Sequence, residues 1–149
     1  MFTLFKKKDL QENVALEISF ASLLIHAARI DENYSEKERE IVKKTLLKLG
    51  VDDNNINNII NEAEIAEENS NQILEFTKEL KNLEEKKKLI LIEALWSIIY
   101  SDKDADIYEA NLMRRISGLL YLDNKLVGDM KEKIRKEKKM TYLVNDKCI

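Results

Sequence analysis

The sequence predicts an all-α protein, folded as a single compact helical domain of about seven helices over residues 1–149. Three observations lead to this prediction. The 149 residues include no proline and only three glycines, so helix-breaking residues are rare. Apolar residues recur at spacings of three and four along most of the chain, which is the period of an amphipathic helix. Hydrophobic residues make up 44% and charged residues 36%, a composition typical of a globular domain.

The first helix is expected over residues 10–30, after a short apolar and basic lead that we expect to be loosely docked. Ser35, with Glu38 three residues later, forms a capping box that opens the second helix, and this helix is expected to stop at Gly50. The most apolar stretch, residues 89–99, predicts a long helix at the buried centre of the protein. Further capping signals are expected to open the other helices: Asp52 or Asp53, Asn69 with Gln72, Asn82 with Glu85, Asp106 with Glu109, and Asp123.

A gapless internal repeat relates the two halves of the chain. A shift of 71 residues brings apolar positions onto apolar positions and caps onto caps. We therefore predict two pseudo-repeated three-helix units, at about residues 10–63 and 83–137, that pack through their apolar faces. Residues 138–149 lose the periodicity and are expected to form a loose tail. The shift aligns the acidic and capping residues of two inter-helix turns: Asp31 with Asp102, Ser35 with Asp106, and Glu38 with Glu109.

Composition excludes several classes of function. With 25 basic and 28 acidic residues the formal net charge is −3, whereas a general nucleic-acid binder carries a basic excess. No apolar run approaches the length of a membrane-spanning helix, and the single cysteine permits no disulfide framework, so we expect a cytoplasmic protein without an integral membrane segment. No phosphate loop and no nucleophile beside a base is found, so we expect no enzyme.

Several metal sites are excluded as well. His26 and Cys148 are the only histidine and cysteine, so no zinc ligand set exists, and the absence of Glu-x-x-His excludes a ferritin-like di-iron centre. The alternating acids from residue 102 to residue 106 resemble the start of a calcium loop. However, Ile107 stands where the turn glycine of an EF-hand belongs, and Met113 stands where its bidentate glutamate belongs. An EF-hand is therefore rejected.

Two interpretations of the acidic turns remain open. In the first, the carboxylates only cap helices, since capping alone accounts for Ser35 and Glu38 and for the corresponding residues of the second turn. In the second, the same carboxylates also bind a divalent cation (Ca, Mg or Mn), because hard cations prefer oxygen ligands. The second interpretation gains force if the repeat brings the two turns together. The candidate metal ligands are Asp31, Glu38, Asp102, Asp104, Asp106 and Glu109.

The doubled pattern of a helix, an acidic turn and a Ser/Asp-x-x-Glu cap resembles the TerB-like family, that of tellurite resistance protein B. The matching segments are residues 27–31 with Ser35 and Glu38, and residues 100–102 with Asp106 and Glu109. The resemblance covers roughly residues 10–137. It implies an all-helical cytoplasmic protein linked to stress or metal-oxyanion response, with acidic residues that bind a metal ion.

The sequence therefore leaves two functions to compare. The first is a non-enzymatic TerB-like module, related to stress or tellurite resistance, with a divalent-cation site at the acidic turns. The alternative is a helical scaffold or adaptor that binds other proteins and has no metal site. An exposed helix face, or the basic segment from residue 131 to residue 139, would then contact the partner.

Overall fold

Seven helices make up the part of the chain that the computed structural model describes, as the all-α prediction requires. They are, in chain order, α1 (Phe2–Arg29), α2 (Glu36–Lys48), α3 (Asp53–Asn69), α4 (Leu74–Leu80), α5 (Glu85–Ile99), α6 (Ile107–Leu119) and α7 (Asn124–Lys147). The structure describes the backbone of residues 2–30, 34–101 and 107–147, and side chains within residues 13–30, 34–101 and 109–138.

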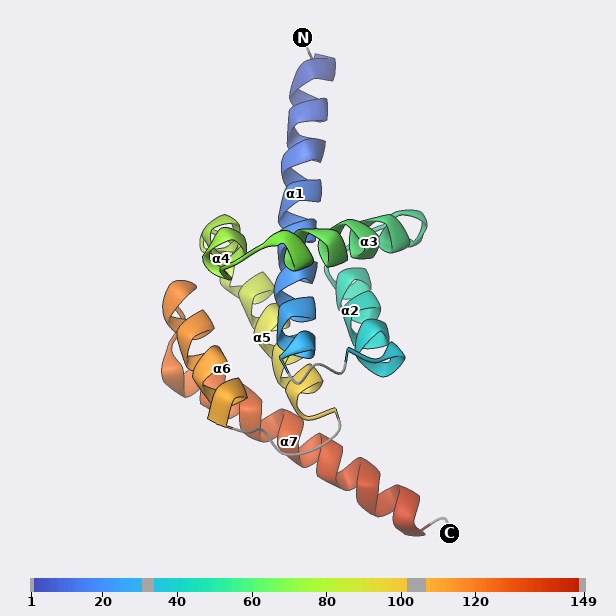
Figure 1. Cartoon of the computed structure of the whole chain (residues 1–149), viewed down its shortest axis with the longest axis vertical. Coiled ribbons are helices and arrows are strands. Elements are labelled where there is room, and N and C mark those ends of the chain that lie inside the picture. Colours follow the sequence, from blue (N-terminus) through green and yellow to red (C-terminus); the bar gives the residue numbers. More distant parts are fainter. Residues whose placement is uncertain (1, 31–33, 102–106, 148–149) are drawn as a thin grey trace.

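Helices α1 and α5 form the centre of the molecule (Figure 1). Helix α1 contacts α2, α3, α4 and α5, and α5 also contacts α2 and α7. Residues 20–25 of α1 are fully buried, as are Leu91 and Leu95 of α5. Trp96 is 4% exposed, and its indole N–H donates a 3.1 Å hydrogen bond to the carbonyl of Val127 in α7. The prediction that residues 89–99 form the buried centre is therefore confirmed, although α1 shares that position.

The remaining helices surround this pair. Helix α4 lies against α1 and α6, while α7 packs on both α5 and α6. The N-terminal half of α1 and the C-terminal part of α7 extend beyond the other helices (Figure 1). Helices α1–α3 correspond in order to the first predicted three-helix unit and α5–α7 to the second, with α4 between them. The pseudo-symmetry that would relate the two units stays a prediction. Over the residues described, no helix combines the length and the apolar character needed to cross a membrane.

Two helices are longer than the periodicity predicts. Helix α1 begins at Phe2, within the lead that was expected to dock loosely, and α7 continues to Lys147, beyond the predicted end near residue 137. Neither extension contains a proline or a glycine. A helix that has already formed adds further residues at little cost when nothing interrupts it, even where the apolar stripe has ended.

The ends of α2 and α6 have the same geometry. At Gly50, which follows α2, φ is 100°, and the N–H groups of Gly50 and Val51 bond to carbonyls of the last helical turn at 3.1 and 3.0 Å. This left-handed Schellman ending confirms Gly50 as the predicted stop. After α6, Tyr121 adopts a φ of 57°, and the N–H groups of Tyr121 and Leu122 make the corresponding bonds at 3.2 and 2.9 Å.

The predicted helix starts are confirmed at some positions and wrong at others. Asp123 accepts a 3.1 Å bond from the N–H of Lys125 and so caps α7 as expected. Asp52 occupies the position before α3, but its side chain makes no capping bond. The expectation for Asn69 is wrong because this residue is the last of α3.

The two capping pairs predicted around α4 fail for different reasons. At the first, the hydroxyl of Ser70 accepts from the N–H of Gln72 at 3.3 Å, which forms a turn before α4 instead of a cap. At the second, α5 begins at Glu85, after Glu84 and without a side-chain cap. Asn82 therefore does not open this helix.

Candidate functional site

The first inter-helix turn leads into a capped and buried carboxylate. Ser35 precedes α2 in an extended conformation, and its hydroxyl oxygen accepts from the N–H of Glu38 at 3.4 Å. The same hydroxyl donates to Oε1 of Glu38 at 3.1 Å. The predicted Ser35–Glu38 pair is therefore confirmed. Glu38 is 2% exposed, and the pair holds its carboxylate at the positive end of the helix dipole.

The second turn is described only at its two sides. On the α5 side, Ser101 is 3% exposed and its hydroxyl donates to the carbonyl of Ile98 at 2.7 Å. On the α6 side, Glu109 is 7% exposed in the first turn of the helix. Like Glu38, it places a buried carboxylate near a helix N-terminus.

A hydrogen bond between distant parts of the chain places the start of α2 beside the end of α5. The ammonium group of Lys37 donates to the backbone carbonyl of Ser101 at 2.7 Å, although the residues are 64 positions apart. The C-terminal ends of α1 and α5 and the starts of α2 and α6 all lie at one end of the bundle (Figure 1). The sides of the two turns that the structure describes are therefore neighbours.

Two carboxylates of α3, absent from the predicted site, hold the two sides of the first turn. Glu67 is bonded through Oε2 to Arg29, near the end of α1, and its Oε1 lies 3.2 Å from Nδ1 of His26. Arg29 also donates to the backbone carbonyl of Glu64 at 3.3 Å. These contacts fix the last turn of α1 against α3. They also give His26 a partner on the side of a packed helix, as expected for a structural histidine.

Glu64 fixes the other side of the turn. Its Oε1 accepts from the Tyr34 hydroxyl at 3.1 Å and from Nε of Arg39 at 3.2 Å. Burial and the neighbouring Glu64 carboxylate raise the pKa of the Tyr34 phenol above its usual value, and the hydrogen bond to Glu64 raises the pKa of Arg39. The guanidinium of Arg29 lies 5.4 Å from the centre of the Tyr34 ring. The first turn is thus held on both sides by ionic and aromatic contacts.

Sequence reasoning missed this network because its partners are far apart in the chain. Glu64 and Glu67 are three residues apart and therefore share one side of α3. That spacing is common among surface charges, so it does not single them out. Lys37 was missed as well, because its acceptor is a backbone carbonyl, and no residue type marks such an acceptor in the sequence.

The structure describes only two of the six candidate metal ligands. Glu38 and Glu109 lie within the described ranges, whereas Asp31, Asp102, Asp104 and Asp106 fall outside them. The capping role predicted for Asp106 lies outside them for the same reason. Among the side chains that the structure describes, no group of three or more His, Cys, Asp or Glu residues is arranged to hold a metal ion. Two carboxylates of α3 are instead bonded to side chains: Glu67 to Arg29, and Glu64 to Tyr34 and Arg39.

The fold and the neighbouring sides of the turns define a class of protein: a small all-α module with a central pair of helices and two inter-helix turns at one end, the first of them capped by Ser35. The sequence model of the family described as tellurite resistance protein TerB matches residues 17–132, which is most of the chain. The chain belongs to the TerB family, so the resemblance drawn from the acidic turns is confirmed. No curated protein and no solved structure matches the chain significantly.

Proposed function

We propose that this protein is a non-enzymatic module of a stress or tellurite-resistance response that binds a divalent cation at its acidic turns. The observation that supports the proposal best is the 2.7 Å bond from Lys37 to Ser101, which sets the start of α2 against the end of α5. A cation would be held between these turns by Asp31, Glu38, Asp102, Asp104, Asp106 and Glu109. We place the module in the cytoplasm.

The chemistry of the two described carboxylates supports this choice of ligand. Glu38 and Glu109 occupy corresponding positions, each the third residue of its helix, α2 or α6, and both are buried. Carboxylate groups taken out of water are stable as ions when positive charge lies nearby. Helix N-termini supply part of that charge, and a hard cation such as Ca, Mg or Mn supplies it through the oxygen ligands it prefers.

Thermal unfolding of the chelated full-length protein tests the proposal, with Ca, Mg or Mn added separately. A cation bound only to the native state, at 100 times its Kd, adds about 2.7 kcal/mol to the free energy of unfolding. For a chain of this length that corresponds to a rise in Tm of roughly 5–10 °C. The double variant Asp102→Asn/Asp104→Asn should lose the rise.

The matched control is Asp52→Asn/Asp129→Asn, which changes the charge equally at two exposed positions away from the turns. It should keep the full response to the cation. If no ion raises Tm, or if both double variants lose the response equally, the cation site is rejected.

The alternative function, a scaffold or adaptor for other proteins, is favoured by a different observation. The ends of α1 and α7 extend beyond the bundle as helices (Figure 1), and in this alternative they would contact the partner. In this alternative the acidic turns act only as caps. An absence of any cation effect, together with loss of partner binding after shortening α1 or α7, would favour it.

A further inference from the structure

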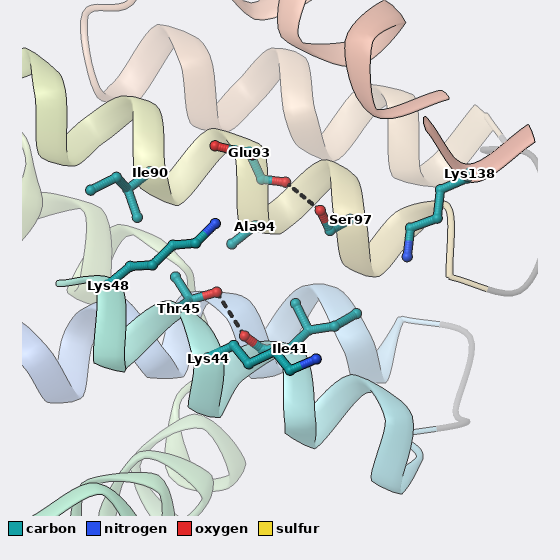
Figure 2. Close-up of a pocket in the computed structure, with 9 residues that line it drawn as sticks. All are labelled: Ile41, Lys44, Thr45, Lys48, Ile90, Glu93, Ala94, Ser97 and Lys138. Atoms are coloured by element: carbon teal, nitrogen blue, oxygen red, sulfur yellow. Dashed lines mark hydrogen bonds between the residues drawn. The ribbon is translucent and has the colours of Figure 1, made fainter. Parts of the chain in front are cut away.

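A second feature lies away from the acidic turns, in a groove between α2, α5 and α7. Its cavity volume is about 190 Å³ (Figure 2). Helix α2 contributes Lys44 and Lys48, α5 contributes Glu93 and Ser97, and α7 contributes Lys138. The groove is therefore lined by three ammonium groups and one carboxylate.

The two lysines of α2 are exposed and flank the buried Thr45. Ile41, Lys44, Thr45 and Lys48 follow the spacing of three and four that places residues on one face of a helix. These four residues line the groove on its α2 side, and α2 contacts α5. Two lysines four residues apart repel each other on a helix. A ligand of negative charge would relieve that repulsion.

Neither lysine is neutralised by a neighbouring acid. In the portion of the protein that the structure describes, Lys44 and Lys48 form no ion pair and no side-chain hydrogen bond. Figure 2 shows the Lys48 side chain extending toward α5, and Lys138 reaching toward the groove from α7. The ammonium groups of Lys44 and Lys48 are thus available to an anion.

The hydroxyl groups of the groove have a different role. Thr45 donates its hydroxyl hydrogen to the carbonyl of Ile41 at 2.7 Å, and Ser97 donates to the carbonyl of Glu93 at 2.9 Å (Figure 2). With these hydrogens engaged, the ammonium groups of Lys44 and Lys48 are donors that remain for a ligand. Lysine binds phosphate as a mobile point charge, and such charge-assisted bonds are stronger than neutral ones.

We propose that this groove binds a small phosphate-bearing anion. The volume of about 190 Å³ is below the roughly 300–1,000 Å³ of pockets for drug-sized ligands, so it suits a phosphate monoester group. The groove lies at the C-terminal half of α2, whereas the acidic turns lie at its start. This binding site is therefore independent of the proposed cation site.

The test is a titration of inorganic phosphate and of glycerol 3-phosphate into the 15N-labelled full chain, followed by amide chemical shifts. We expect saturable shifts near Lys44, Lys48 and Ser97. The variant Lys44→Gln/Lys48→Gln should weaken binding by at least about tenfold, since it removes two charge-assisted donors. The control Lys78→Gln/Lys86→Gln removes the same charge from exposed positions outside the groove and should bind as the unmodified chain does.

A second arm distinguishes a lipid headgroup from a free phosphate. Vesicles of phosphatidylcholine with phosphatidic acid are compared with vesicles of phosphatidylcholine alone, in a sedimentation assay with the same two variants. Binding to phosphatidic acid that requires Lys44 and Lys48 would identify the headgroup as the source of the phosphate. The proposal is overturned if neither probe binds saturably, or if both double variants weaken binding equally, because net charge alone would then explain the effect.

Discussion

The matching ends of α2 and α6 allow a prediction in which two substitutions have opposite effects on stability. Gly50 and Tyr121 each adopt a left-handed conformation after a helix, with φ of 100° and 57°. An L-residue with a side chain is strained by about 1–2 kcal/mol in this conformation. Glycine avoids the strain but gives the unfolded chain more freedom, which costs about 0.4–1 kcal/mol. Glycine is therefore favoured at both positions by a net amount of about 0.5–1 kcal/mol.

Gly50→Ala should therefore lower the free energy of unfolding by about 0.5–1 kcal/mol. A Cβ atom placed on Gly50 meets nothing within 4 Å, so the effect arises from the backbone conformation and not from a clash. Tyr121→Gly should raise the free energy of unfolding by a similar amount. The Tyr121 side chain is 77% exposed, so its removal sacrifices little packing.

Urea unfolding followed by tryptophan fluorescence measures both changes. Trp96 is the single tryptophan and is 4% exposed, so its emission reports the loss of the core. Equal m-values for the three proteins would show that only stability has changed. A neutral or stabilising Gly50→Ala, or a destabilising Tyr121→Gly, would refute the reasoning from backbone strain.

Two further predictions concern side chains in the fold. Lys88 is 9% exposed and donates to the carbonyl of Leu120, at the end of α6, at 2.9 Å. Lys88→Met should lower the free energy of unfolding by about 1–3 kcal/mol because that carbonyl loses its charged donor. The control Lys86→Met, at an exposed position, should change the free energy of unfolding little in the same urea assay. Tyr34 has a raised pKa in the folded protein, so its contribution to stability is present below its ordinary pKa of 10.0 and is lost as the pH rises toward the folded value. Urea unfolding measures how much the free energy of unfolding falls between about pH 8 and about pH 11, and this fall should be smaller for Tyr34→Phe than for the unmodified chain. Equal falls would contradict the raised pKa assigned to Tyr34.

The helical class, the family and several helix ends could be predicted from local sequence patterns. Ser35, Gly50 and Asp123 are correct because their signals act within one turn of chain. A hydroxyl or carboxylate caps an N–H group two or three residues away, and a glycine adopts the left-handed conformation where the helix stops. The buried stripe around Trp96 was predictable for a similar reason, since helical spacing alone shows which side chains share a face.

The same local signals also fail where a competing local interaction is stronger. Asn69 and Asn82 carry the residue type of a cap, yet α3 continues through Asn69 and α5 starts at Glu85. At the first position, helix extension adds hydrogen bonds that outweigh an asparagine cap. At the second, the carbonyl of Glu84 accepts the first hydrogen bonds of α5, from the N–H groups of Lys87 and Lys88, so the helix opens two residues after Asn82. The long α1 and α7 show that an apolar stripe predicts where a helix is packed and does not predict where it ends.

The contacts between distant groups depend on how the helices pack in three dimensions. The bond from Lys37 to Ser101 and the contacts of Glu64 with Tyr34 and Arg39 join segments far apart in sequence. In the same way, Lys138 of α7 lines one groove with lysines of α2. No periodicity encodes such pairs, because they depend on how whole helices pack. The acidic turns could therefore be identified from residue types. The proximity of their described sides, and the basic groove farther along α2, follow from the packing of α2 against α5.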